Sequence, residues 1–247
     1  MKLQFNIIWH DRVSSTNTTL RELAETMPGL PSGTVIASRE QTGGRGRFDR
    51  VWVSGKDENL TFSLYLRTGI APHRLPSAAM AAAVAVADFL ECEGLQASLK
   101  WPNDVLVNGK KICGILSEVV SGGVMIGIGL NVNMDKTAHI DQPATSMRLE
   151  SGKPYDRESL LLSLLERLRP PLVAWENRGF SGIRESWEAR ALNLGKPIRL
   201  RDGETYREGI LAGFGEDGEL LLQTPESTRL SIWSGELTSP PLRRHHS

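Results

Sequence analysis

The segment DVLVNGKKICGILSEVVSGGVMIGIGLN, residues 104–131, holds the clearest structural pattern in the chain. Apolar residues 105–107 and 112–120 flank Asn108-Gly109, a pair that accepts the positive φ angles of a type I′ turn. Gly122-Gly123 then turns the chain into another apolar run at 124–131. The segment therefore predicts a β-hairpin followed directly by a further strand.

Glycines alternate along these strands. Because successive side chains point to opposite faces, Gly114 and Leu116 lie on one face of the first strand. Gly127, Gly129 and Asn131 likewise share one face of the following strand. Alternate glycines weaken a strand but leave room for a flat group close to the backbone. We interpret the glycine-bearing faces of these two strands as a ligand platform and the isoleucine side as core. Close packing of a helix onto the glycines is the alternative that the pattern leaves open.

Outward from this segment, the sequence predicts an α+β fold in which a mixed sheet has flanking helices. Strands are expected at 3–9, 35–38 and 60–66, and helices at about 17–26, 75–93, 156–177 and 180–191. Short strands at 197–201, 206–214, 219–223 and 229–233, separated by polar turns, predict a small C-terminal β-barrel. We place the domain boundary near Asn193, which gives domains 1–192 and 193–247.

Composition excludes several classes of protein. The 247 residues carry 29 basic and 29 acidic side chains, so no overall field attracts nucleic acid or an anionic membrane. The two cysteines are too few for a disulfide framework, and Cys113, among aliphatic residues, is expected to be buried and inert. We find no signal peptide and no apolar run of membrane-spanning length. These features predict a cytoplasmic protein without a membrane partner.

A glycine- and arginine-rich stretch, QTGGRGR at 41–47, has the composition of an anion-binding loop. Glycines let backbone N–H groups approach a ligand, and Arg45, Arg47 and Arg50 add forked donors for phosphate or carboxylate. The stretch is neither a Walker A loop nor a dinucleotide fingerprint. A flexible solvated loop is the alternative.

Two further clusters frame the hairpin. Lys100-Trp101-Pro102-Asn103-Asp104 opens it, and Lys111 lies at the edge of the glycine platform, where it could neutralise a carboxylate or phosphate. An ordinary turn and an exposed lysine are the alternatives.

In order, the motifs Ser15-Thr16-Asn17, QTGGRGR, Trp52, KWPND at 100–104, KICGILSE at 111–118 and GIGLNVN at 127–133 closely resemble the biotin protein ligases. The resemblance is dense from about Ser14 to Asn133 and looser beyond. It implies a biotin–lipoate ligase-like fold related to class II synthetases, with an SH3-like C-terminal barrel. It also implies ligation in two steps. Biotin and ATP, with Mg²⁺, would give biotinyl-5′-AMP, and biotin would then pass to a lysine of a biotin carboxyl carrier protein of acetyl-CoA carboxylase or a related carboxylase.

The resemblance also implies roles for individual residues, while the metal ligands are left unassigned. Lys111, Arg47 and Asp104 would be catalytic, with Asp104 ordering the site or assisting the acceptor lysine. The residues implied to bind biotin are Ser15, Thr16, Asn17, Gln41, Gly44, Arg45, Lys111, Gly114, Leu116, Gly127 and Gly129. Those implied to bind ATP or the adenylate are Arg45, Arg47, Arg50, Trp52, Asn103, Lys111 and Asn131.

Two departures from the family pattern affect these expectations. Phe48-Asp49 stands where many relatives have a basic residue and a glycine, and Asp49 would weaken the local positive field. The chain also starts at the catalytic strand, so we expect a short form without an N-terminal DNA-binding domain, no DNA as partner, and allow a homodimer. A lipoate or octanoate ligase or transferase is the nearest alternative. A non-catalytic biotin-binding module is the other, although Lys111 and the arginines would be superfluous in it.

Overall fold

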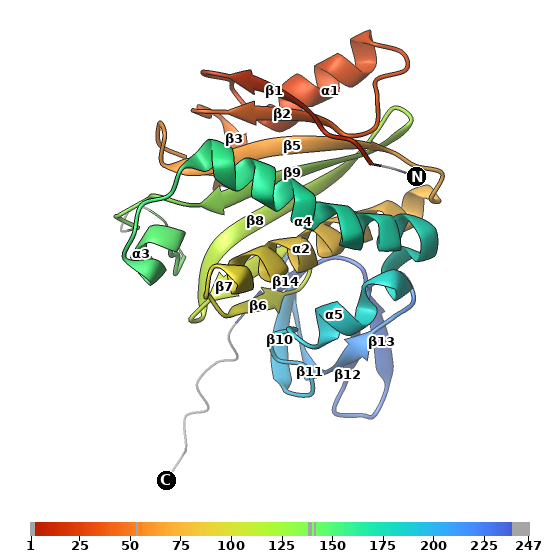
Figure 1. The fold of residues 1–247 in the computed structure, drawn as a ribbon. Coiled ribbons are helices and arrows are strands. Elements are labelled where there is room, and N and C mark those ends of the chain that lie inside the picture. The colour runs from red at the N-terminus through yellow and green to blue at the C-terminus, as the bar shows by residue number, and fades with distance from the viewer. Residues whose placement is uncertain (1–2, 53, 138–139, 141, 239–247) are drawn as a thin grey trace.

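The computed structural model describes residues 3–52, 54–137, 140 and 142–238. A seven-stranded mixed sheet forms its centre, in the order β1-β2-β5-β9-β8-β7-β6 (Figure 1). Only the β1–β2 pair is parallel; the other pairs are antiparallel. The strands are β1 (Asn6–His10), β2 (Thr34–Ser38), β5 (Asn59–Arg67), β6 (Ala97–Lys100), β7 (Asp104–Val107), β8 (Lys110–Val120) and β9 (Gly123–Asn131). The predicted α+β fold is confirmed.

The hairpin in the opening segment is present as predicted. Asn108 and Gly109 have φ angles of 50° and 74°, as a type I′ turn between β7 and β8 requires. In the next pairing, Gly114 lies opposite Gly129 and Leu116 opposite Gly127. The glycines of two strands therefore form one continuous surface.

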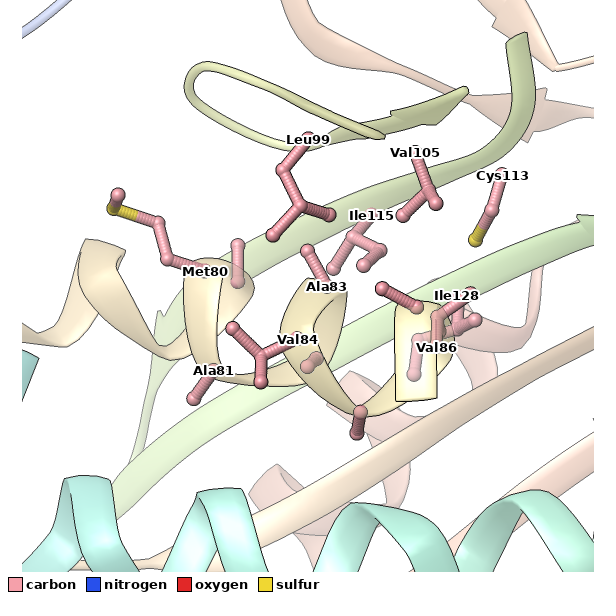
Figure 2. Packing of buried hydrophobic residues seen from close by; sticks show 14 of the residues in the cluster. Met80, Ala81, Ala83, Val84, Val86, Leu99, Val105, Cys113, Ile115 and Ile128 are labelled. Atoms are coloured by element: carbon pink, nitrogen blue, oxygen red, sulfur yellow. The ribbon is translucent and has the colours of Figure 1, made fainter. Parts of the chain in front are cut away.

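Helices cover the two faces of the sheet unequally. On one face lie α2 (Ala78–Cys92) and α4 (Arg157–Arg178), whose apolar residues join the main core (Figure 1). Figure 2 shows α2 against Val105, Cys113, Ile115 and Ile128 of the sheet. The other face carries α1 (Thr16–Thr26), which contributes Leu20 and Ala24 to a smaller cluster. The glycine surface lies on this second face.

One helical stretch qualifies the expectation that the chain has no apolar run of membrane-spanning length. The helical stretch Pro72–Cys92, which includes the 3₁₀ turn η2 (Pro72–Ser77), has the length and mean hydropathy, 1.5, of a membrane span. However, 78% of its apolar window is buried inside the protein. Alanine dominates α2, and its small side chains let the helix pack close to the sheet, so its hydropathy reflects a core position.

Further differences concern short elements. The helix expected at 180–191 is instead a 3₁₀ turn, η3 (Gly179–Gly182), followed by one short helix, α5 (Arg184–Glu188). The sequence pattern did not predict β6, α3 (Met147–Ser151) or β14 (Glu236–Thr238). The loop at 41–52 contains a two-stranded ribbon, β3 (Gly44–Arg45) and β4 (Val51–Trp52), around the turn η1 (Arg47–Asp49).

The C-terminal region forms a five-stranded antiparallel sheet in the order β13-β12-β11-β10-β14. Its strands are β10 (Pro197–Asp202), β11 (Thr205–Phe214), β12 (Leu220–Gln223), β13 (Arg229–Ile232) and β14. Phe214 packs edge-on against Phe180 and Trp187, and Trp101 donates a 3.0 Å hydrogen bond to the carbonyl of Gly218. These contacts fix the small sheet beside the KWPND turn. We propose 192/193 as the domain boundary, because Asn193 and Gly195 have positive φ angles there.

Candidate active site

A cavity of about 710 Å³ opens between the glycine surface, the arginine-rich loop and the start of β14. It has the size of a small-molecule site. Of the site residues expected from the sequence, those that line it are Ser15, Thr16, Asn17, Gln41, Arg45, Arg47, Arg50, Trp52, Asn103, Asp104, Lys111, Gly114, Leu116, Gly127 and Gly129. Residues from five separate stretches of chain, 15–17, 41–52, 103–104, 111–116 and 127–129, therefore meet at one place.

The remaining two expected residues, Gly44 and Asn131, do not line the cavity. Asn131 is 3% exposed and donates its side-chain amide to the carbonyl of Thr145, at 2.9 Å. A Cβ at Gly44 would lie 2.6 Å from the carbonyl oxygen of Trp52, so this glycine permits the close approach of β3 and β4. Both residues therefore stabilise elements next to the cavity without lining it.

The indole of Trp52 lies on the glycine surface. A Cβ added to Gly129 would be 2.4 Å from Trp52 Cε2, and one added to Gly114 would be 2.9 Å from Cζ3. The predicted room for a flat group is therefore real, and in this structure the protein's own tryptophan fills part of it. The Trp52 Nε1 is buried and has no hydrogen-bond partner within the described part of the chain.

Beyond Trp52, the floor of the cavity becomes polar. A Cβ at Gly127 would lie 2.2 Å from Asn17 Oδ1, so this glycine admits a side chain from α1. The alternative of a helix packed onto the glycines is thus correct at this one position. Beside it, the backbone N–H of Thr16 donates to Gln41 Oε1 at 2.8 Å. Acceptors and donors held this way suit the ring of a small polar head group.

Lys111 and Asp104 face each other at the other side of the glycine surface. Lys111 Nζ lies 2.7 Å from Asp104 Oδ1, and both side chains are 18% exposed. The same ammonium lies 5.7 Å from the centre of the Trp52 ring. Asn103 is adjacent and donates to the carbonyl of Ile115, which holds the turn before β7 against β8. A partly desolvated cation at this position can stabilise negative charge on a bound anion.

The arginines of the loop reach the C-terminal sheet. Arg47 donates to the carbonyl of Gly235 at 3.1 Å, and Arg50 makes two bonds of 2.7 and 2.5 Å to the Glu236 carboxylate. Burial lowers the pKa of the Arg47 guanidinium, and the charges of Asp104 and Glu236 offset only part of this. The side chain of Asp49, expected to weaken the field here, lies outside the described part of the structure. Gly235 and Glu236 line the cavity, which the sequence did not indicate.

The described residues provide neither a reactive thiolate nor a cluster of metal-binding side chains at the site. Cys113 is fully buried, and this burial raises the pKa of its thiol far above the ordinary value, so it is not a thiolate nucleophile. Within the described ranges, no group of three or more His, Cys, Asp or Glu side chains could hold a metal ion. The charged side chains that line the cavity are Arg45, Arg47, Arg50, Lys100, Asp104, Lys111 and Glu236.

Comparison with known proteins agrees with this geometry. The family model described as biotin/lipoate A/B protein ligase matches residues 9–135. The bifunctional ligase/repressor BirA of Bacillus subtilis is 36% identical, over 94% of this chain and 73% of its own length. The biotin–[acetyl-CoA-carboxylase] ligase of Paracoccus denitrificans is 35% identical, over 87% of this chain and 92% of its own length.

Comparison with a solved structure supports the same family assignment. The biotin protein ligase of Aquifex aeolicus, in complex with biotin and ATP, superposes with a TM-score of 0.81 at 33% identity, covering 94% of this chain and 97% of that one. The chain therefore belongs to the biotin/lipoate A/B protein ligase family, and within it to the biotin protein ligases.

Proposed function

We propose that this protein uses ATP to convert biotin into biotinyl-5′-AMP and then transfers biotin to a lysine of a biotin carboxyl carrier protein. Relatives named biotin–[acetyl-CoA-carboxylase] ligase support this proposal, as does the related structure that contains biotin and ATP. The observation that carries it is the meeting of Lys111, Asp104 and Arg47 at the edge of the glycine surface. An anion-binding group there is needed for adenylation but not for binding biotin alone.

In the first step, an oxygen of the biotin carboxylate would bond to the α-phosphorus of ATP as the bond to pyrophosphate breaks. Negative charge then accumulates around the α-phosphate. Lys111 would hold the reacting carboxylate and phosphate together, while Arg47 and Arg45 would cover the phosphate from the loop side. The protein's contribution is thus positioning and charge stabilisation.

In the second step, the amine of the acceptor lysine would attack the acyl carbon of the mixed anhydride, and AMP would leave. The attacking nitrogen must lose a proton. Asp104, within 2.7 Å of Lys111, is the carboxylate placed to accept it or to steer the incoming ammonium group. No covalent intermediate on the enzyme is needed, in agreement with the buried Cys113.

Magnesium would enter with ATP. Asp104 is the carboxylate beside Lys111, and no three-carboxylate cluster is found in the described residues. The residues present therefore fit a magnesium ion held mainly by phosphate oxygens and water. A cytoplasmic location and a carboxylase carrier domain as acceptor complete the proposal.

The polar end of the cavity favours biotin over lipoate. Lipoate needs a long apolar channel, whereas Thr16 and Gln41 offer hydrogen-bonding groups suited to a ureido ring. The decisive experiment measures exchange of labelled pyrophosphate into ATP with biotin or lipoate, followed by transfer to a purified carrier domain. Exchange with biotin alone and labelling of one carrier lysine are expected. Exchange driven by lipoate, or none with either acid, would overturn the proposal.

A further inference from the structure

A chain of polar side chains lies behind the head-group end of the cavity and crosses from the site to the protein surface. Thr16 Oγ1 is 2.7 Å from Ser63 Oγ, which is 2.5 Å from Asn17 Oδ1. Asn17 Nδ2 donates to Glu118 Oε2 at 2.8 Å, and Arg21 donates to the other oxygen of Glu118 at 2.6 Å. Ser63 and Thr16 are 0% and 4% exposed, so water does not compete at the inner end.

The far end of this chain fixes the direction of every proton in it. A carboxylate only accepts hydrogen bonds, so Asn17 must turn its NH₂ group toward Glu118 and its oxygen toward Ser63. The reverse orientation would bring two oxygen atoms together. Ser63 has one proton, which Asn17 Oδ1 requires, and Ser63 must therefore accept the proton of Thr16.

The consequence at the cavity concerns Thr16. Its hydroxyl proton is directed inward to Ser63, so only lone pairs of Thr16 Oγ1 face the ligand. Gln41 Oε1 accepts the backbone N–H of Thr16 at 2.8 Å. Its 3.1 Å contact with Thr16 Oγ1, across which that hydroxyl could also donate, is the longest contact of the chain and is the one left without a proton. Both groups are then acceptors, and both match an N–H donor on the ligand.

We propose that Glu118, oriented by Arg21, is a positioning residue that makes this pocket selective for a ligand carrying a ring N–H. The inference rests on the proposed function, in which that ring is the ureido ring of biotin. Glu118 acts through Asn17 and Ser63 and does not itself line the cavity. The donor and acceptor roles at Thr16 are thus set by the Glu118 carboxylate, through its hydrogen bond from Asn17.

Replacing Glu118 by glutamine should reverse the chain. Arg21 can only donate, so it will hold the new amide oxygen, and the amide NH₂ will point to Asn17. Asn17 must then flip and donate to Ser63, which in turn donates to Thr16. The Thr16 proton is pushed out toward Gln41 and the ligand, where it opposes an incoming N–H group.

This reversal predicts a rescue that ordinary structural damage would not show. In the double variant Arg21→Met/Glu118→Gln, nothing holds the amide oxygen outward, so glutamine can turn its oxygen to Asn17 and restore the original direction. The single variant Arg21→Met keeps the carboxylate and should behave like the unaltered protein. Adding a second substitution should therefore improve binding.

The experiment uses the full chain and measures biotin-dependent pyrophosphate release. Two biotin analogues, each with one ureido N–H replaced by oxygen, report the need for a donor. We expect Glu118→Gln to raise the KM for biotin about tenfold, the usual size of one lost hydrogen bond. The KM for ATP should be unchanged. The preference for biotin over the more strongly discriminated analogue should fall by a similar factor, and Arg21→Met/Glu118→Gln should recover both values.

Glu91→Gln is the matched control, since Glu91 forms a similar ion pair with Arg190 at 2.6 Å far from the cavity. Ser63→Ala cuts the chain directly and should also reduce the preference, which keeps the proposal testable if Glu118→Gln does not fold. An unchanged preference in Glu118→Gln or Ser63→Ala, or a double variant worse than Glu118→Gln, would overturn the inference. Absence of biotin-dependent pyrophosphate release from the unaltered protein would instead overturn the proposed function.

Discussion

The two ends of the cavity are built from different interactions. At the head-group end, Thr16 and Ser63 are almost completely buried and lie within a continuous hydrogen-bonded chain. At the phosphate end, Arg50 and Glu236 are 47% and 22% exposed, and Arg47 reaches the Gly235 carbonyl 188 residues further along the chain. Buried hydrogen bonds hold one geometry, whereas exposed ion pairs are weakened by water and salt. We therefore expect the ring of the ligand to meet a preformed surface and its reacting end to meet a cover that can open.

The largest effect is expected where the two ends meet, at Lys111. Lys111→Ala removes the cation held 2.7 Å from Asp104, and with it stabilisation of the charge that develops on the α-phosphate. We expect adenylate formation to slow by about 3–5 kcal/mol, roughly two to four orders of magnitude. Single-turnover pyrophosphate release measures this. The neighbouring exposed Lys110→Ala is the control, and a folded Lys111→Ala protein with near-normal release would remove Lys111 from the mechanism.

Arg47→Gly tests whether the phosphate end is a cover. The substitution removes both the guanidinium and its bond to Gly235, so the adenylate should escape before the carrier lysine arrives. We expect labelling of bystander lysines to rise about tenfold, the equivalent of losing one charged hydrogen bond. Mass spectrometry of a carrier and albumin mixture measures the ratio. Arg47→Lys, which keeps the charge but loses the fork, should be intermediate. Labelling confined to the carrier would show that Arg47 does not retain the intermediate.

The difference between the two ends also explains which features of the site could be predicted from the sequence. The glycine surface follows from alternation within one continuous segment, so Gly114, Gly127 and Gly129 could be placed from side-chain periodicity alone. The Asn-Gly turn is equally local. Polar residues at every second position of β5, such as Thr61 and Ser63, carry the same kind of signal, since they share a face while Phe62 faces the core. This alternation predicts that Thr61 and Ser63 lie on the face opposite the core.

The cover at the phosphate end was not predictable in the same way. Arg50 was expected to contact a phosphate, but nothing local in the sequence indicates that Glu236 is its partner in the structure, 186 residues away. The short strand β14, which presents Glu236, contains only three residues and gives no periodic pattern. Long-range pairing of exposed charges depends on the completed fold. The position of Asn131 was not predictable for a different reason, because its buried amide bonds to the Thr145 carbonyl in a loop that has no periodic pattern.

Gly129→Ala tests the preformed surface. The added Cβ would lie 2.4 Å from Trp52 Cε2, so the indole must leave the platform or the strand must shift. We expect a loss of about 1–3 kcal/mol in unfolding free energy, the usual cost of overpacking, with a higher KM for both substrates. Urea denaturation and steady-state kinetics measure these changes. Gly69→Ala is the control, because a Cβ there meets nothing within 4 Å. Unchanged stability would mean that Trp52 is not held against Gly129.

The smallest effect is expected from Glu236→Gln, which should loosen the cover without altering the head-group end. The bonds from Arg50 to Glu236 are exposed, so the substitution should cost only about 0.5–1 kcal/mol. Hydrogen exchange in residues 44–52 should accelerate by a few-fold, and the difference from the unaltered protein should shrink in concentrated salt. Glu208→Gln is the control, since Glu208 pairs with Arg199 in the same sheet.

The pH dependence of this ion pair separates it from a packing effect. Burial alone would raise the pKa of Glu236, but the hydrogen bond and charge of Arg50, with Lys100 and Arg201, outweigh burial and lower it. A lowered pKa in the folded state means that the stabilisation is present above the ordinary glutamate value of about 4.3 and is lost as the pH falls through the lower folded value. Hydrogen exchange in residues 44–52 should therefore be faster in Glu236→Gln than in the unaltered protein by a constant factor from neutral pH down to about 5. This difference in rate should disappear only in stronger acid. A difference that persists in strong acid would show that the loop is held by packing rather than by charge, and the contrast between the two ends of the cavity would be lost.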